Sequence, residues 1–162
     1  MPKFRISNYS LRIKTIKWIH NHFNDQIIPI CDWMASKLNA VAESFISEAR
    51  TKLAAAVDFF RCDLAKFSPA WLYPPITAIP NVIQKLRSER EFQCLLVVPY
   101  SFSKIWWSQM QSMMIGNPLI WKCRTLLLET GLPVTVSLSV CCALLCRVST
   151  SSMGRPQKRQ RS

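Results

Sequence analysis

The sequence predicts a small α/β domain of three layers, in which helices cover both faces of a mostly parallel sheet. The prediction rests on one continuous stretch. A short apolar run at residues 70–73 enters a turn at Pro74 and Pro75, an amphipathic segment follows, and a second apolar run occupies residues 92–98. This order of strand, turn, helix and strand is typical of parallel sheets, whose strands are usually connected through a helix.

The segment between the two apolar runs has helical spacing. Its apolar side chains recur at intervals of three, four and seven residues, which places them on one face of a helix: Ile79, Val82, Ile83 and Leu86. Pro80 is compatible with this helix because it falls in the first turn. The run at 92–98 is apolar without alternation, which indicates a parallel strand buried on both faces.

The N-terminal part predicts a helix, a strand and a second helix. Ser10 can cap a helix whose apolar side chains recur at helical spacing: Ile13, Ile16, Ile19 and Phe23. Residues 27–31 form a short β-branched run that we interpret as a strand ended by Asp32, although Pro29 would remove a ladder hydrogen bond. The alanine-containing composition of residues 43–60 predicts a helix.

Downstream of the second apolar run, the pattern predicts one more helix and one more strand. Residues 104–114 form a segment rich in Trp and Met, and we expect this helix to pack through three side chains: Ile105, Trp106 and Met110. Residues 119–121 favour a short strand. We therefore expect the α/β domain to cover residues 8–122, with an incomplete sheet.

The remainder of the chain differs in character. We expect residues 123–148 to form an apolar appendage, in which no charged side chain occurs from Leu132 to Val148 except Arg147. Its uncharged part is shorter than the ~20 residues that span a bilayer, so a buried or poorly ordered segment is favoured over a membrane anchor. Residues 149–162 have the composition of a disordered basic tail.

The chain is strongly basic. Its 21 Lys and Arg residues and 9 Asp and Glu residues give a net charge of +12. No acidic residue occurs before Asp25 or after Glu129, so the surplus is concentrated at the two ends. Such a surplus favours a polyanion, and we expect nucleic acid to bind the basic surface and tail, whereas membrane binding is less favoured. The alternative is an ordinary solvated surface.

The cysteines and histidines predict neither a metal site nor a disulfide framework. The 7 cysteines are odd in number and none has C-x-x-C spacing. His20 and His22 lie two positions apart on the predicted helix and therefore face different directions. Cysteines scattered in apolar runs are typical of small buried side chains. No secretory signal opens the sequence, so we expect an intracellular location, either cytoplasmic or nuclear.

Common catalytic signatures are absent from the sequence. It contains no G-x-G-x-x-G, G-x-x-x-x-G-K-[ST], H-E-x-x-H or G-x-S-x-G motif. With 3 glycines it also has few positions for close approach of the backbone to phosphate. Asp32 follows a predicted strand, where an acid that contacts a ligand is expected. The alternative role for Asp32 is helix capping.

Several short motifs nevertheless occur in a characteristic order. They are Asp32-Trp-Met-Ala-Ser-Lys-Leu-Asn-Ala, Phe45-Ile-Ser-Glu-Ala, Trp71-Leu-Tyr-Pro-Pro-Ile, Leu95-Leu-Val-Val-Pro and Trp106-Trp107. Through them, residues 8–122 resemble the segment after the ribonuclease H region in polyproteins of tyrosine-recombinase (DIRS-type) retroelements. That segment is similar to phage-type DNA N6-adenine methyltransferases. The resemblance implies a Rossmann-like fold, and no resemblance extends beyond about residue 130.

The resemblance also implies the position of a cofactor site. Asp32 matches the acid of a motif that lies near S-adenosylmethionine in the methyltransferases, and Ser36 and Asn39 match polar positions of the same motif. If the chain were active, S-adenosylmethionine would be its cofactor and these three residues would contact it.

A second motif carries the catalytic contribution in the methyltransferases, where it reads Asn-Pro-Pro-Tyr. Pro74 and Pro75 match its prolines, but Tyr73 replaces the asparagine and Ile76 replaces the aromatic residue. The asparagine accepts a hydrogen bond from the target amino group, and the aromatic ring stacks on the flipped base. Tyrosine has no amide and isoleucine has no π face, so neither contribution is available from these positions.

The sequence therefore predicts an inactive remnant of a retroelement-encoded DNA adenine methyltransferase-like domain, without a cofactor, that has residual affinity for nucleic acid. One alternative is an active S-adenosylmethionine-dependent DNA N6-adenine methyltransferase with a variant motif. Another is a non-enzymatic interaction protein, or a weak membrane anchor through residues 132–148.

Overall fold

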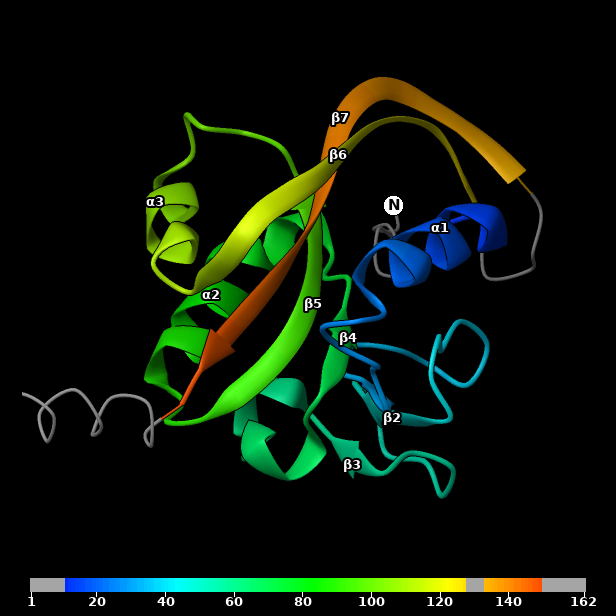
Figure 1. Cartoon of the computed structure of the whole chain (residues 1–162). Coiled ribbons are helices and arrows are strands. Elements are labelled where there is room, and N and C mark those ends of the chain that lie inside the picture. Colours follow the sequence, from blue (N-terminus) through cyan, green and yellow to red (C-terminus); the bar gives the residue numbers. More distant parts are fainter. Residues whose placement is uncertain (1–10, 128–132, 150–162) are drawn as a thin grey trace, which may run out of the picture.

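The computed structural model describes residues 11–127 and 133–149 and has an α/β fold built on one seven-stranded sheet (Figure 1). The strands are β1 (Cys31–Asp32), β2 (Ser44–Ser47), β3 (Ala56–Val57), β4 (Ala70–Leu72), β5 (Phe92–Pro99), β6 (Met114–Leu127) and β7 (Pro133–Val148). The α-helices of these ranges are α1 (Ile13–Phe23), α2 (Ile79–Ser88) and α3 (Ile105–Gln111), and the short 3₁₀ helices are η2 (Phe59–Arg61), η3 (Leu64–Phe67) and η4 (Ile76–Ala78). Ser10 and residues 150–162 of the predicted tail lie outside the described residues.

The strand order is β3-β2-β1-β4-β5-β7-β6. The five strands from β3 to β5 are parallel to their neighbours, whereas β7 is antiparallel to both β5 and β6. The mostly parallel α/β fold that the sequence predicts is therefore confirmed. The sheet also contains three strands that the sequence pattern did not predict: β2, β3 and β7.

Helices cover both faces of the sheet, with α1 on one side and α2 and α3 on the other (Figure 1). Alternate side chains of β5 divide between the two cores. One set faces α2 and α3: Phe92, Cys94, Leu96 and Val98. Leu95 and Val97 face α1. This alternation explains why the sequence of β5 is apolar throughout, and it confirms a strand buried on both faces.

Helix α2 has the apolar face that its sequence predicts. All four predicted side chains are at most 1 % exposed: Ile79, Val82, Ile83 and Leu86. Each such burial contributes about 1.5 to 3 kcal/mol relative to an exposed side chain. Pro80 lies at the start of the helix, where it removes no intrahelical hydrogen bond. The predicted strand, Pro-Pro turn and helix after the turn are thus confirmed.

The predicted helix over residues 43–60 is wrong. Phe45 and Ile46 are buried in β2, which pairs in parallel with β1, and Phe59 is buried in a separate 3₁₀ turn. Asp58 has a positive φ of 69°, which an α-helix does not accommodate. Burial of these side chains in the sheet therefore outweighs the helix propensity of the intervening alanines.

The first predicted strand is largely wrong as well. Only Cys31 and Asp32 pair with neighbouring strands, whereas Ile28 and Ile30 are exposed. Pro29 has no N–H to donate, and pairing begins beyond it. The Ile30 N–H instead donates to the Pro69 carbonyl at 2.9 Å.

The C-terminal apolar stretch belongs to the sheet. Strand β7 (Pro133–Val148) lies between β5 and β6, and residues 142–146 are buried. Of the interpretations of this stretch, the buried segment agrees with the structure and the separate appendage does not. Strand β6 also runs through the boundary expected at residue 122. Within the described ranges, no helix has the length and apolar character needed to cross a membrane.

Candidate functional site

The strand order reverses between β1 and β4, because the chain adds β2 and β3 on one side and β5 on the other. In doubly wound α/β proteins, ligands bind outside the carboxyl ends of the strands at such a point. Asp32 is the last residue of β1, and Tyr73 directly follows β4. Asp32 is the register partner of Trp71, two residues before Tyr73. The fold therefore brings the two predicted motifs to the same edge of the sheet.

Asp32 is 3 % exposed and lies on the α1 face of the sheet, because its neighbours Cys31 and Trp33 both face the opposite core. Its carboxyl oxygens accept two backbone hydrogen bonds from the loop that follows β1. The Val41 N–H donates at 2.9 Å and the Met34 N–H donates at 3.4 Å. Asp32 therefore fixes its own loop, and helix capping, the alternative role, is not what it does.

The environment of Asp32 disfavours its charged form. Burial raises the pKa of this carboxyl to about 7, and the hydrogen bonds from Val41 and Met34 oppose that shift only in part. Asp32 therefore titrates near neutral pH. A perturbed carboxyl at the carboxyl edge of a sheet is a candidate functional group. Here its two hydrogen bonds also give it a structural role.

Ser36 and Asn39 form a turn in the same loop. The Asn39 side-chain oxygen accepts a hydrogen bond from the Ser36 N–H at 2.8 Å, and the Ser36 carbonyl accepts from the Asn39 N–H at 3.2 Å. The Ser36 hydroxyl accepts from the Leu38 N–H at 3.2 Å. The polar groups that were predicted to contact a cofactor are thus engaged in closing their own turn.

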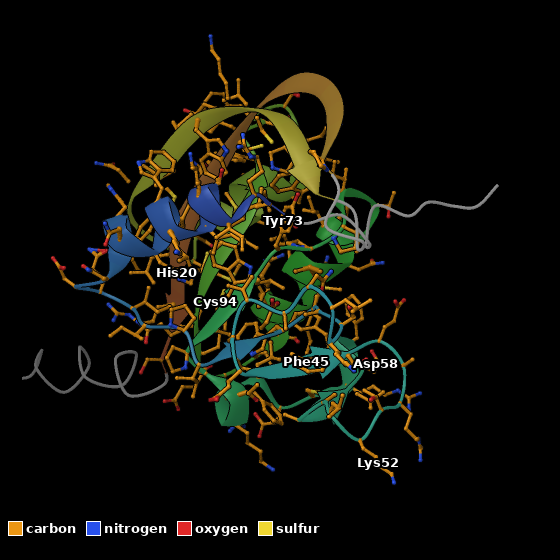
Figure 2. All side chains as sticks on the ribbon, turned by 90° about the vertical axis from the view of Figure 1, so that its right-hand side faces the viewer. His20, Phe45, Lys52, Asp58, Tyr73 and Cys94 are labelled. Carbon is orange, nitrogen blue, oxygen red and sulfur yellow. The ribbon has the colours of Figure 1, made fainter. Side chains whose placement is uncertain are left out.

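Tyr73 is half-buried and packs against the core beneath α1 (Figure 2). Cys123 and Cys141, from β6 and β7, lie close enough to influence its ionisation. Burial, the larger cause, and these two thiols raise the pKa of the Tyr73 phenol above its ordinary range. The side chain therefore stays protonated and lies against apolar neighbours and thiols.

The rest of the Tyr-Pro-Pro-Ile turn connects β4 to α2. Pro74 is buried, Pro75 is half-buried and precedes η4, and the Ile76 side chain is 57 % exposed. An exposed aliphatic group can contact a base by its surface area alone. It lacks the flat face on which an aromatic residue stacks.

An aromatic cluster follows β5 at the same edge. The rings of Tyr100, Phe102 and Trp107 meet edge to face, with centroids 4.7 to 5.4 Å apart. Trp106 and Met110 are buried as predicted, but Ile105 is 83 % exposed, so its predicted packing role is wrong. Trp107, which follows Trp106 in α3, fills the core position instead.

A shallow hollow of about 530 Å³ lies at the opposite edge of the sheet, where β5 begins. Its lining combines both charges: Arg61, Cys62, Asp63, Ala65, Ser88, Glu89, Arg90 and Glu91. Glu89 is held by the Lys85 ammonium at 2.8 Å and by the Leu64 N–H at 3.0 Å. These contacts join α2 to η3, so the hollow is a junction between elements and not the predicted site.

The outward surface of α1 was not predicted as a site. Lys14, Lys17 and Trp18 share this surface and are exposed, and the Trp18 ring meets the ring of Trp121 from β6 at 5.8 Å and 85°. The sequence signal was the spacing of Lys14, Lys17 and Trp18, which differ by three and four positions. Composition assigns these lysines to a basic N-terminal part, whereas the structure shows that they share a surface with Trp18.

Among the described residues, no group of three or more His, Cys, Asp or Glu side chains could hold a metal ion. The two histidines are separated as the spacing indicates: His20 packs on Trp71, with ring centroids 5.1 Å apart, and His22 is exposed. A scan against protein-family models and a search among curated proteins find no match to this sequence.

Proposed function

We propose that this chain is a catalytically inactive, methyltransferase-like domain of retroelement type that binds nucleic acid. The observation that carries the proposal is the turn after β4. It lies at the switch point of the sheet, yet Tyr73 packs into the α1 core and Ile76 exposes an aliphatic surface. Transfer of a methyl group to an amine requires polar groups in fixed geometry at the acceptor. Neither residue offers an amide or a stacking face toward an adenine.

The cofactor side supports the same proposal. Asp32 is buried, and its pKa of about 7 reflects an environment that favours the neutral form. Ser36 and Asn39 bond to each other. A carboxylate binds the polar groups of a ligand best when it is accessible and ionised. We therefore expect no measurable affinity for S-adenosylmethionine.

The nucleic-acid part of the proposal is supported by charge. The net charge of +12 favours a polyanion, and phosphate contacts need only accessible cations, not a catalytic geometry. A nucleic-acid partner also fits the intracellular location, cytoplasmic or nuclear, that we expect for the chain.

The first test is calorimetric titration of S-adenosylmethionine into the full-length chain. The full length is required because β7 supplies the partner strand of both β5 and β6. We expect no heat of binding beyond dilution. Saturable binding that is lost in Asp32→Asn would contradict the proposed inactivity.

The second test is transfer of a labelled methyl group from S-adenosylmethionine to DNA that contains adenine. We expect no label in DNA above the level obtained without protein. Tyr73→Phe is the matched variant, because it removes the hydroxyl and keeps the packed ring. Transfer by the wild-type chain that Asp32→Asn abolishes would establish the active alternative, and its loss in Tyr73→Phe would give the phenol a role in it.

The third test is nucleic-acid binding at two salt concentrations. We expect affinity for DNA to fall between about 50 mM and about 200 mM salt, because binding releases counterions. Absence of binding at the lower concentration, or affinity that does not change with salt, would remove the nucleic-acid part of the proposal and leave the inactivity unaffected.

A further inference from the structure

The outward surface of α1, here called the α1 surface, consists of Lys14, Lys17 and Trp18. We infer that it binds single-stranded nucleic acid, with phosphates at its cations and a base stacked on Trp18. The inference rests on the proposed nucleic-acid function and locates it.

The first argument is the division of α1 into two faces. Ile19 and Phe23 are buried against the sheet, and Ile16 packs beside them. Lys14, Lys17 and Trp18 lie on the other side, separated by three and four residues, so that they are neighbours on one exposed surface. The apolar face that an amphipathic helix would insert into a membrane is therefore already occupied by the sheet.

The second argument is charge. Within residues 11–127 and 133–149, the ion pairs join Arg61 to Asp58 and Lys85 to Glu89, and none involves Arg12, Lys14 or Lys17. No acidic residue occurs in α1 or in the sequence of β6 beside it. Lys14 and Lys17 are thus available to phosphates, which a continuous strand of nucleic acid supplies at regular intervals.

The third argument is the geometry of Trp18. Its side chain is 45 % exposed, and its ring is held at 85° to the ring of Trp121 from β6. A tryptophan supported in this way offers a fixed aromatic surface at low entropic cost. Bases of a single strand stack on such surfaces, whereas the bases of a duplex are already stacked on each other. This geometry favours a single strand over a duplex.

Lys52, Arg87 and Arg90 lie away from the α1 surface. Lys52 lies at the outer tip of the loop between β2 and β3, away from α1 (Figure 2). Arg87 and Arg90 lie at the end of α2, a helix that packs on the opposite face of the sheet. Substitution of both arginines by alanine removes the same charge at another place and serves as the control.

The experiment measures fluorescence anisotropy of a labelled oligothymidine of about 12 nucleotides with the full-length chain. The double variant Lys14→Ala/Lys17→Ala is expected to weaken binding about tenfold and to reduce the slope of log K against log salt by about 1.4, the value for two phosphate contacts on a single strand. Arg87→Ala/Arg90→Ala is the charge-matched control and should change affinity by less than about twofold. Equal losses in both double variants would overturn the assignment of the α1 surface.

The aromatic part is tested by a matched series. Trp18→Ala is expected to weaken binding about tenfold, and Trp18→Phe to recover most of that loss, because phenylalanine keeps a stacking face. Phe102→Ala removes an exposed aromatic ring at the carboxyl edge and should leave affinity unchanged. Circular dichroism confirms that each variant is folded. A loss in Phe102→Ala with none in Trp18→Ala would place the contact at the carboxyl edge and contradict the inference.

Three further outcomes bear on this inference, and the first of them separates it from the proposed function. Strong binding that none of the α1 variants weakens would preserve the nucleic-acid function and overturn its location. Binding to vesicles of anionic phospholipid, without binding to the oligonucleotide, would overturn both and assign the surface to membranes. A duplex of equal length that binds more tightly than the single strand would overturn the stacking contact.

Discussion

The carboxyl edge of the sheet and the α1 surface differ in how far their polar and aromatic side chains are engaged within the fold. At the edge, Asp32 and Asn39 are engaged in hydrogen bonds within their own loop, and Trp33 is fully buried. On the α1 surface, Lys17 and Trp18 are exposed. The polar side chains of the edge are therefore already engaged, whereas those of the α1 surface are exposed and can meet a ligand.

This difference reflects what each activity demands. Catalysis of methyl transfer depends on reacting groups placed to within a fraction of an ångström, so under the proposed function the residues at Tyr73 and Ile76 are enough to prevent it. Binding of a polyanion depends on accessible charge and tolerates variation in the position of each cation. A fold can therefore lose the first property and keep the second, provided that substitutions at the edge still pack.

The largest expected effect is on the free energy of unfolding. It distinguishes Trp33, at the carboxyl edge, from Trp18, on the α1 surface. Trp33 donates its Nε1–H to the Phe67 carbonyl at 2.9 Å and packs on Phe59 and Phe92. Trp33→Ala should lower the free energy of unfolding by about 4 kcal/mol, because it leaves a large cavity. Trp18→Ala should lower it by about 1 kcal/mol or less. Urea denaturation of both variants measures the difference.

The matched control is Trp33→Phe, which keeps part of the packing and removes the hydrogen bond. We expect its stability to lie between those of the wild type and Trp33→Ala. If Trp33→Ala were as stable as Trp18→Ala, the edge would not have the structural role that separates it from the α1 surface.

The next effect concerns the pH dependence of stability through Asp32, at the carboxyl edge. The pKa of Asp32 is raised from 3.8 to about 7 by burial, so the folded state binds its proton more tightly than the unfolded state does. The stability that this group contributes is present at low pH and is lost as pH rises toward its folded-state pKa. Between about pH 5 and about pH 8, the free energy of unfolding should fall by about 3 kcal/mol through this group.

Asp32→Asn removes the titration and keeps an oxygen that can accept from the Val41 N–H. Its stability should therefore vary less with pH than that of the wild type, and it should exceed the wild type at about pH 8. Asp25→Asn changes an exposed carboxylate near the end of α1 and serves as the control. If the wild type and Asp32→Asn varied equally with pH over this range, Asp32 would be charged in the folded protein, as a cofactor-binding acid would be.

A smaller effect is expected at the turn between Ser36 and Asn39. Asn39→Ala removes the acceptor of the Ser36 N–H, which costs about 1 kcal/mol in a partly buried turn. Asn39→Asp keeps an acceptor at the same place and should recover most of the loss. If both variants were as stable as the wild type, the Asn39 side chain would be available for another partner.

The sequence predicted the centre of this fold better than its ends. The period of Ile79, Val82, Ile83 and Leu86 located α2, and the unbroken apolar run located β5, since both patterns follow from burial on fixed faces. It failed for β2 and β3, which are only a few residues long, because alanine content suggested a helix. It also failed for β7, because its 16 residues form a run longer than an ordinary strand.

The positions of the candidate residues in the fold were predictable from the sequence, and their contacts were not. The order of the motifs placed Asp32 and Tyr73 at one edge, and β1 and β4 do end there. The engagement of Asp32 by Val41 and of Asn39 by Ser36 depends on the path of one loop, which composition does not specify. The T-shaped contact of Trp18 with Trp121 joins residues of α1 and β6, and local spacing cannot reveal it.

The smallest expected effect concerns the attachment of α1 to the sheet. Burial lowers the pKa of His20 below its ordinary value of 6.5, and within the described residues its Nε2 atom has no hydrogen-bond partner. The unfolded state therefore binds a proton more readily than the folded state does. The stability that neutral His20 contributes is present above about pH 6.5 and is lost as pH falls below it. Hydrogen exchange of α1 amides, corrected for intrinsic rates, should show weaker protection at about pH 5 than at about pH 7.

His20→Phe keeps a ring against Trp71 and cannot titrate, so its α1 protection should not depend on pH. His22→Gln, on the exposed side of the same helix, should behave like the wild type. The pH dependence of stability through His20 has the opposite sign to that through Asp32. Hydrogen exchange of α1 amides reports on α1 alone, so the two contributions can be measured separately in one protein. Equal protection of α1 at both pH values in the wild type would mean that protonated His20 is accommodated. In that case α1 would stay attached to the sheet at acidic pH, and only the carboxyl edge, through Asp32, would respond to pH.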